Sequence, residues 1–321
     1  MSIEVQGVPA ENLETIATCL LCGSKRFQVA LETPPWTLRR CEKCDIVFTS
    51  PRYNGPALDD LYAGEYYEGS NRYFEDQGTP PSSDHLELAY RVKRLLGTSQ
   101  GKRSLDVGCG GGRQVEAFAK VGFDACGVEP STASVELASS LNRNVSCEGI
   151  QDVNDSTYDC LTAIHVLEHV SDPRWFVAEM FRAAAPGAIV VIEVPNFASK
   201  ASVRMGKDWY PLHPSTHLFH FSPKTLEQVC RSVGFRTVKI RRLGGAGMFN
   251  DVSESVVSKK PAGSPPHAVS AKPASPKSLK SLLWRLRGPV LQLPGARNLL
   301  RWVNWELLGH GQYVQIIARK P

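Results

Sequence analysis

The sequence predicts an α/β protein: a parallel nucleotide-binding sheet with a small cysteine-rich module ahead of it. Three observations predict this fold. Residues 104–130 follow the pattern strand, glycine turn, helix, strand, which makes one βαβ unit. Apolar strand-like segments and amphipathic helical segments then alternate as far as residue 243. Two Cys-x2-Cys pairs lie well before this alternation begins.

Length and composition limit the kind of protein. A chain of 321 residues exceeds one average domain and can bury a substantial core. It has no apolar stretch of about twenty residues and no N-terminal apolar run with a cleavage site, so we expect a cytoplasmic protein without a membrane span. In that compartment the nine cysteines favour metal binding and reduced thiols over disulfides.

Four of the cysteines form two pairs with the spacing of a metal site. Cys19 and Cys22 make the first pair, and Cys41 and Cys44 make the second. Four thiolates in two such pairs can close a tetrahedron around Zn²⁺, and four protein ligands leave no open position for catalysis. We therefore predict a structural zinc ribbon as the first domain, residues 1–50. No basic, aromatic-interleaved patch accompanies it, so a nucleic-acid partner is not expected.

Residues 51–84 join this ribbon to the main domain. They are dense in tyrosine and turn formers, and such aromatic side chains mostly pack between neighbouring elements. We predict an aromatic linker here. The main domain is expected to span residues 85–321 and to begin with an amphipathic helix at 85–96 that leads into the first strand.

The glycine turn is the strongest sign of a ligand site. The predicted elements around it are a strand at 104–107, a helix at 114–120 and a second strand at 124–128. Gly108, Gly110 and Gly112 force a tight turn that larger side chains could not follow, and the helix then presents free N–H groups. Glu129 ends the second strand, where a carboxylate can hold two ribose hydroxyls.

The order D-x-G-x-G-x-G over residues 106–112 resembles motif I of the class I S-adenosylmethionine-dependent methyltransferases. A Rossmann dehydrogenase, which would show G-x-G-x-x-G, is the alternative. The resemblance implies a Rossmann-like sheet of seven strands with the last strand antiparallel, and S-adenosylmethionine as the cofactor. Gln151 or Asp152, or backbone groups, would hold the adenine, because the acid that many members carry there is missing. The residues expected to line the cofactor are Asp106, Gly108, Cys109, Gly110, Gly112, Glu129, Pro130, Gln151 and His165.

Later segments extend the resemblance. Further elements are predicted as a helix at 131–142 and strands at 145–147, 158–164, 187–194, 235–243 and 313–319. AIHVLEHVSDP (163–173) and THLFHFSPKTLEQVCRSVGF (216–235) resemble the ubiquinone-biosynthesis (quinone) O-methyltransferases. The pattern LYAGEYY within 51–84 resembles the lid that closes over the cofactor in many methyltransferases. Deoxysugar C-methyltransferases also carry a zinc ribbon ahead of this domain. The resemblance thus implies a small-molecule or lipid-linked acceptor, a quinol or a glycan. We expect transfer to an oxygen of this acceptor, with a sugar C-methyltransferase as an alternative, and the sequence does not settle whether O, C or N is methylated.

Five of the eight histidines gather in the two segments expected to flank the acceptor: His165, His169, His213, His217 and His220. Methyl transfer from a sulfonium is an in-line displacement that one base assists. We predict His217 as that base and His165 as the next choice, although each could be a hydrogen-bonded structural histidine. A Glu-x-x-Glu-His set with a further histidine holds a divalent metal in some quinone and small-RNA methyltransferases. His165, Glu168, His169 and His217 match it in three of four positions, so Glu168 and His169 are either metal ligands or groups that order the loop.

Residues 247–310 interrupt the domain before its last strand. Residues 258–278 are Ser, Pro, Ala and Lys, which is typical of a disordered linker. Residues 279–308 predict two short amphipathic helices with tryptophans and many basic residues. Such helices are typical of peripheral contact with an anionic membrane, here at its inner face, or of a cover over the sheet. A chain that binds S-adenosylmethionine without catalysis, as a regulatory or interaction protein, remains the competing function class.

Overall fold

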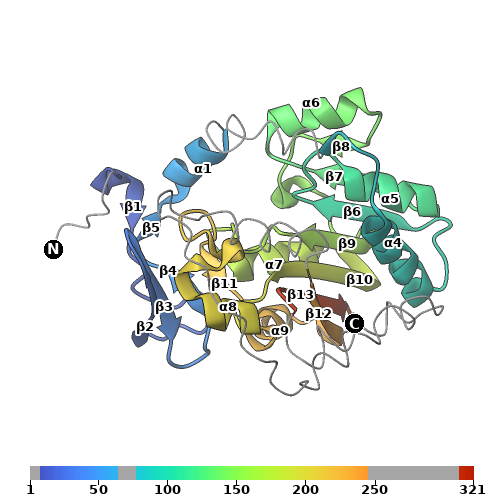
Figure 1. Ribbon diagram of the computed structural model, residues 1–321. Coiled ribbons are helices and arrows are strands. Elements are labelled where there is room, and N and C mark those ends of the chain that lie inside the picture. Colours follow the sequence, from blue (N-terminus) through green and yellow to red (C-terminus); the bar gives the residue numbers. More distant parts are fainter. Residues whose placement is uncertain (1–7, 64–76, 245–310) are drawn as a thin grey trace, which may run out of the picture.

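The computed structural model describes residues 8–63, 77–244 and 311–321. Its central element is a seven-stranded sheet in the order β12-β13-β10-β9-β6-β7-β8 (Figure 1). The strands are β6 (Arg103–Val107), β7 (Asp124–Val128), β8 (Val145–Ser146), β9 (Tyr158–Ile164), β10 (Ala184–Pro195), β12 (Arg236–Leu243) and β13 (Tyr313–Arg319). The seven strands predicted from the sequence are thus confirmed as one sheet.

Strand direction in this sheet follows the prediction. The strands β6 to β10 pair in parallel, whereas β13 lies antiparallel between β10 and β12. The antiparallel last strand is therefore confirmed. One boundary differs, because β10 begins at Ala184, three residues before the predicted start. Its register shifts between Ala184 and Ile189, and Gly187 within this stretch has a φ of 79°.

Helices cover both faces of the sheet. They are α4 (Ser83–Leu96), α5 (Arg113–Val121), α6 (Thr132–Ser140), α7 (Pro173–Ala183) and α9 (Pro223–Ser232). Successive residues of one strand point to opposite faces. In β10, Val190 belongs to the core cluster that includes α7 and α9, whereas Ile189 belongs to the cluster that includes α4 and α5.

Local sequence sets where the helices begin and end. Gly112 precedes α5 with a φ of 76°, and Gly122 ends it with a φ of 98°, both in the left-handed region that favours glycine. The Asp172 carboxylate accepts from the N–H groups of Arg174 and Trp175 and so caps α7. Gly112 and Asp172 lie in the turns that follow β6 and β9, at the carboxyl ends of these strands, where parallel sheets bind ligands.

The N-terminal part forms a second sheet of four strands in the order β11-β4-β3-β2. The strands are β2 (Phe27–Thr33), β3 (Trp36–Cys41), β4 (Val47–Thr49) and β11 (Phe219–His220), with a small pair β1 (Leu13–Glu14) and β5 (Arg52–Tyr53) and the helix α1 (Gly55–Ala63) beside them. We call residues 13–53 the ribbon. Its fourth strand comes from residues 219–220, which the sequence did not indicate.

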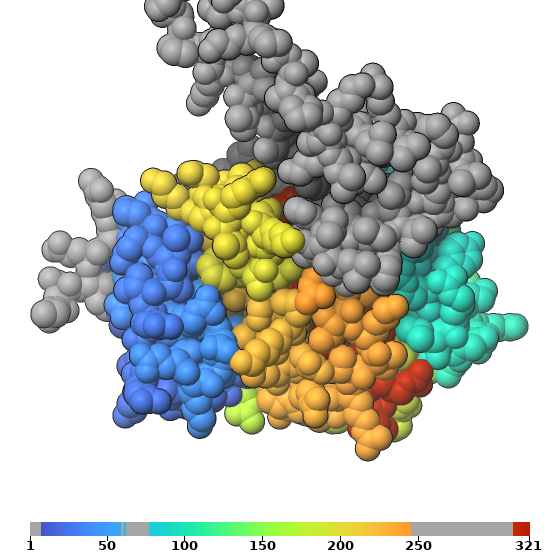
Figure 2. Space-filling model, turned by 60° about the horizontal axis from the view of Figure 1, so that its bottom comes forward, coloured from blue at the N-terminus to red at the C-terminus, as the bar shows by residue number. Residues whose placement is uncertain are grey.

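The ribbon packs on the main domain. Leu38 and Val47 of the ribbon share an apolar cluster with Trp209 and Leu212. These two residues lie in a segment that contains α8 (Lys200–Met205) and the short 3₁₀ turns η3 (Gly206–Asp208) and η4 (Tyr210–Leu212). Figure 2 shows the blue ribbon directly against the yellow part of the chain that includes α8. The ribbon and this segment therefore form one packed unit.

Two predicted features lie largely outside the described residues. Residues 64–76 hold most of the tyrosine-rich pattern expected to form a lid, and residues 245–310 hold the basic insert. Both stay predictions. Within the described residues, none of the helices has the length and apolar character needed to cross a membrane.

Candidate functional site

In the glycine turn between β6 and α5, the backbone passes very close to side chains of neighbouring segments. Gly108, Gly110 and Gly112 have positive φ values of 66°, 52° and 76°. A Cβ added at Gly108 would lie 2.7 Å from the side chain of Val166, and one added at Gly112 would lie 2.9 Å from Val145. The turn therefore requires glycine at both of these positions.

Two buried carboxylates flank this turn. Asp106 is 7% exposed and accepts a hydrogen bond from the Thr162 hydroxyl at 2.5 Å. Glu129 is 4% exposed, and its two oxygens accept from the N–H groups of Gly110 at 2.9 Å and Ser131 at 3.0 Å. Each oxygen keeps a lone pair for a ligand hydroxyl. Glu129 therefore both braces the turn and can bind a diol.

Burial raises the pKa of both acids. The pKa of Asp106 rises to about 7, because desolvation and the nearby Glu129 charge outweigh the hydrogen bond from Thr162. The pKa of Glu129 also rises through burial, against the effect of its two N–H partners. A cationic ligand would offset this cost, whereas a phosphate would increase it. The site thus fits S-adenosylmethionine, which carries a sulfonium and an ammonium and no phosphate.

The other predicted cofactor residues lie around the same turn. Cys109 is buried, and its sulfur occupies the space beside Gly127, so only its backbone can face a ligand. Pro130 follows Glu129, and its carbonyl accepts from the exposed Cys147 thiol at 3.7 Å. The Gln151 amide donates to Asp152 at 3.1 Å, so these two side chains already pair with each other.

The four ribbon cysteines lie together. Their sulfur atoms are all within 4.8 Å of one another, with Cys19 3.6 Å from Cys44 and Cys22 3.5 Å from Cys41. Each pair sits in a tight turn, in which Gly23 N–H donates to Cys19 and Asp45 N–H donates to Cys41. The hydrogen bond from the Cys44 thiol lowers the pKa of Cys19 to about 5. This arrangement fits one tetrahedral metal ion.

A second cluster combines the polar residues that follow β9 with His217. Glu168, His169 and His217 place ligand atoms within 4.8 Å of one another. The Glu168 side chain is 1% exposed, and neither of its oxygens has a hydrogen-bond partner among the described residues. Its charged neighbour is the His165 ring, whose Nδ1 lies 3.4 Å from Oε1. A buried carboxylate with so few polar contacts is costly, and a bound cation would reduce that cost.

The surroundings of His217 keep its ring neutral and oriented, as a metal ligand requires. Its Nδ1 lies 2.9 Å from the carbonyl of Pro211, so Nδ1 carries the proton and Nε2 is left for a ligand. Its ring lies 4.6 Å from that of His169. Burial, with further contributions from the neighbouring histidines, holds the pKa of His217 far below the usual range. Burial also lowers the pKa of His169. Both imidazoles are thus neutral near pH 7.

His165 differs from the other histidines. Its Nδ1 lies 3.4 Å from Glu168 Oε1 and its Nε2 lies 3.8 Å from Glu193 Oε1. The side chain is 42% exposed, and desolvation by the surrounding residues lowers its pKa, but the two carboxylates outweigh this effect and raise the pKa of His165 overall. Its φ of 58° is unusual for a residue other than glycine, and such strain often marks functional positions. The side chain also packs edge-on against Tyr313, with ring centroids 4.9 Å apart.

Of the residues around His165, the sequence indicated Glu168 but not Glu193, Tyr313 or Gln315. Glu193 ends an apolar run on β10 and accepts from Gln315 at 2.8 Å, while Tyr313 and Gln315 come from β13. A lone acid near the carboxyl end of an otherwise apolar strand was the available signal for Glu193. Nothing in the local pattern of β13 indicated which residue it would face, because that depends on its pairing with β10.

The remaining two histidines take different places. His213 is exposed, and its ring lies 5.2 Å from that of His217. His220 is part of β11, and burial lowers its pKa to about 3. Its Nε2 lies 3.4 Å from the Thr49 hydroxyl of the ribbon. His220 therefore has a structural position between the two sheets.

Comparisons with known proteins agree with this geometry. A family model described as a methyltransferase domain matches residues 83–240. The chain is 38% identical over 159 residues to a ubiquinone biosynthesis O-methyltransferase from Methylococcus capsulatus, covering 45% of this chain and 67% of the relative. It is 31% identical over 151 residues to the protein of the same name from Alkalilimnicola ehrlichii, covering 43% of this chain. This chain spans 61% of that relative's length.

A solved structure shows the same fold. The phosphoethanolamine N-methyltransferase 2 from Haemonchus contortus, in complex with S-adenosylmethionine, is 15% identical with a TM-score of 0.50. The similarity covers 86% of this chain and 63% of that one. At this identity it supports the fold of the domain and carries no information on the acceptor.

Proposed function

Because the chain belongs to the class I S-adenosylmethionine-dependent methyltransferase family, we propose that it transfers the methyl group of S-adenosylmethionine to an oxygen of a small or lipid-linked acceptor. The observation that carries this proposal is the pair of buried acids at the glycine turn, Asp106 and Glu129. The names of the relatives, O-methyltransferases of ubiquinone biosynthesis, support oxygen as the methylated atom and a quinol as the acceptor class.

The bound cofactor supplies an electrophilic methyl group on a sulfonium. Transfer to an acceptor hydroxyl would form a C–O bond as the methyl–sulfur bond breaks, and it would release the hydroxyl proton to a base supplied by the chain. A base that accepts this proton must be unprotonated near neutral pH yet basic enough to hold it. His217 was favoured from the sequence, but its lowered pKa makes it a weak base. His165, whose pKa is raised by Glu168 and Glu193, suits the role better.

Replacing His165 with glutamine tests this proposal. We expect turnover to fall by about 100-fold, because general-base catalysis contributes on that order, while the Kd for S-adenosylmethionine changes far less. The neutral imidazole is the active form, so activity of the unaltered chain should rise with pH as His165 loses its proton. The measurement is transfer of a labelled methyl group into a lipid extract, with mass spectrometry of the product.

Two outcomes would contradict the proposal. Products from cells with and without the chain should differ by one methyl replacing one hydrogen, and identical extracts would favour a binding protein without catalysis. An unchanged pH profile in the His165→Gln variant would remove His165 from the mechanism. A product methylated on carbon would favour the sugar C-methyltransferase alternative.

Two metal sites accompany this function. We propose that Cys19, Cys22, Cys41 and Cys44 hold a structural Zn²⁺. We further propose that Glu168, His169 and His217 hold a divalent ion, which would polarise the acceptor oxygen and lower its pKa. One carboxylate and two neutral imidazoles favour Zn²⁺ or Co²⁺ over Mg²⁺.

Cobalt binding checks the second metal site. Co²⁺ added to the zinc-loaded chain is expected to give a visible d–d absorption band, which the Glu168→Gln variant should lose. Glu148→Gln, a substitution of an exposed acid, is the matched control and should keep the band. Turnover that survives exhaustive chelation, with the ribbon zinc still bound, would exclude a catalytic metal.

Contact of residues 279–308 with an anionic membrane would suit a lipid-linked acceptor, since it would hold the enzyme at the inner face of the membrane. This remains part of the proposal, as does a cytoplasmic location.

A further inference from the structure

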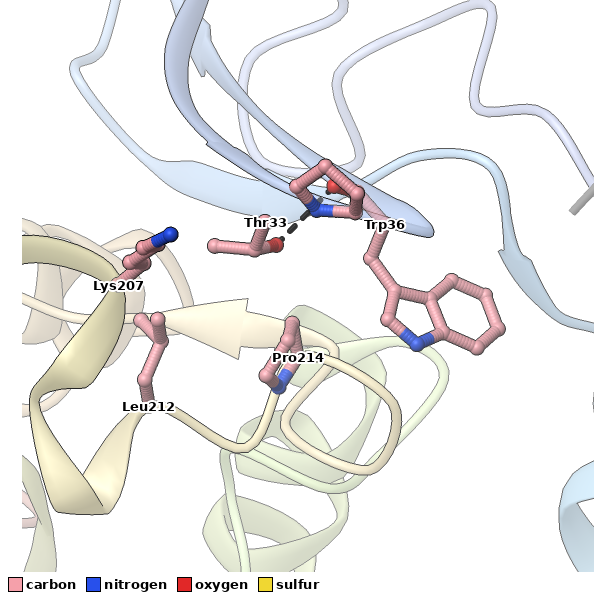
Figure 3. A pocket seen from close by; sticks show the side chains of 6 residues that line it. Thr33, Trp36, Lys207, Leu212 and Pro214 are labelled. Carbon is pink, nitrogen blue, oxygen red and sulfur yellow. Dashed lines mark hydrogen bonds between the residues drawn. The ribbon is translucent and has the colours of Figure 1, made fainter. Parts of the chain in front are cut away.

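A cavity of about 370 Å³ lies where the turn between β2 and β3 meets residues 206–214 (Figure 3). Its lining consists of Thr33, Pro34 and Trp36 from the ribbon and Lys207, Leu212 and Pro214 from the main domain. This volume falls within the range of about 300–1,000 Å³ that small-molecule sites occupy. None of the lining residues belongs to the glycine turn or to the Glu168 cluster.

The walls of the cavity combine apolar and polar surface, and the apolar part is held in place. Trp36 and Leu212 are 7% and 2% exposed. The Trp36 ring packs on Tyr53, with centroids 5.2 Å apart. The Thr33 hydroxyl donates to the Trp36 carbonyl at 3.1 Å and so fixes the turn between the strands (Figure 3). A flat apolar ligand would therefore meet a preformed surface.

The polar groups of the cavity are mainly donors. Lys207 is exposed and forms no ion pair within the described part of the chain. The indole N–H of Trp36, on the side of the ring that faces Pro214, has no hydrogen-bond partner among residues 8–63, 77–244 and 311–321 (Figure 3). Among the residues that the structure describes, no carboxylate lines the cavity. A negative charge would thus find a cation and a neutral donor without repulsion.

We propose that this cavity binds a small amphipathic anion: a flat apolar ring that carries one carboxylate, with Lys207 pairing with the charge and Trp36 contacting the ring. The exposed cation of Lys207 favours a ligand with a negative charge, and the volume of the cavity favours a small molecule. The proposal concerns a site separate from the S-adenosylmethionine pocket and does not depend on the function proposed above.

Binding here would also act on the histidine cluster. Leu212 and Pro214, which line the cavity, stand on either side of His213 in the chain. The carbonyl of Pro211, in the same segment, accepts the hydrogen bond from His217 Nδ1. A ligand that fixes this segment therefore also fixes the Pro211 carbonyl oxygen, which orients the His217 ring.

The test uses 4-(trifluoromethyl)benzoate as the probe and the full-length, zinc-loaded chain, labelled with 5-fluorotryptophan. We expect saturable fluorine NMR shifts of the probe and of the Trp36 resonance, which the Trp36→Phe variant identifies. Lys207→Gln should weaken binding about tenfold, because a charge-assisted hydrogen bond is lost. Arg204→Gln removes a neighbouring exposed cation that does not line the cavity and should leave the affinity unchanged.

Two further arms make the outcome decisive. The neutral amide of the probe should bind about tenfold more weakly than the carboxylate. Saturating S-adenosylhomocysteine should leave the probe's affinity unchanged. The proposal is overturned if the Trp36 resonance does not shift, if Lys207→Gln and Arg204→Gln weaken binding equally, or if S-adenosylhomocysteine competes with the probe. Because Lys207 is exposed, its substitution is not expected to alter folding, and an unchanged melting temperature verifies this.

Discussion

Glu129→Ala is expected to raise the Kd for S-adenosylmethionine by about 100-fold or more. The carboxylate would lose its hydrogen bonds to two ribose hydroxyls, and each charge-assisted bond contributes about 1.5–3 kcal/mol. A loss of about 1.4 kcal/mol corresponds to a tenfold change in Kd. The substitution also removes the acceptor for the N–H groups of Gly110 and Ser131, which loosens the turn. Isothermal titration calorimetry measures the effect directly.

The matched control for this substitution is Glu136→Ala. Glu136 is an exposed acid on α6, a few residues further along the chain, and its loss should leave the Kd unchanged. Equal affinity of the Glu129→Ala variant and the unaltered chain would contradict the assignment of the cofactor site. Binding of a nicotinamide dinucleotide in place of S-adenosylmethionine would contradict it more completely.

The second large effect is expected from Cys41→Ser. Cys41 is fully buried at the end of β3, and removing one of four thiolates should abolish zinc binding. Structural zinc supplies much of the folding free energy of such small modules, so we expect the ribbon to unfold and the melting temperature to fall by about 10 °C or more. Zinc content by atomic absorption and a thermal melt check both expectations.

Unfolding of the ribbon should disturb the packing around the histidine cluster but leave the cofactor site intact. Leu38 and Val47 pack against Trp209 and Leu212, in the segment that orients His217, so turnover should be lost. Glu129 takes its partners from Gly110 and Ser131, outside the ribbon, so the Kd for S-adenosylmethionine should change by less than about threefold.

The control is Cys147→Ser, which removes an exposed cysteine outside the ribbon and should preserve zinc and stability. Loss of cofactor binding together with zinc in the Cys41→Ser variant would instead indicate that the two parts unfold as one unit. That result would argue against treating residues 1–50 as a separate domain.

Local sequence predicted much of the fold. The glycine turn, Glu129 and the two cysteine pairs were all found because each depends on a short pattern with a strict steric or chemical reason. Pairing between distant segments has no such short pattern in the sequence, so it could not be predicted. The positions of β11 beside β4 and of Gln315 beside Glu193 depend on how the chain folds back over more than one hundred residues.

The candidate site was predicted in part for the same reason. The sequence identified His165 and His217 as polar residues in the two segments expected to flank the acceptor, but their roles depend on their surroundings. Two carboxylates raise the pKa of one, and burial among imidazoles lowers the pKa of the other. Spacing in the sequence carries no information on such environments, and it is these environments that favour His165 over His217 as the base.

The contribution of Phe219 and His220 to the ribbon sheet has a consequence for how such proteins can be recombined. These two residues pair with Phe48 and Val47, and the Arg52 guanidinium lies 5.4 Å from the centre of the Phe219 ring. A chimaera that exchanges only the N-terminal 53 residues between relatives would pair β4 of one protein with β11 of another, and the side chains of these two strands would not match. Exchange of the ribbon between relatives is therefore expected to succeed only when β11, which lies far away in the sequence, is exchanged with it.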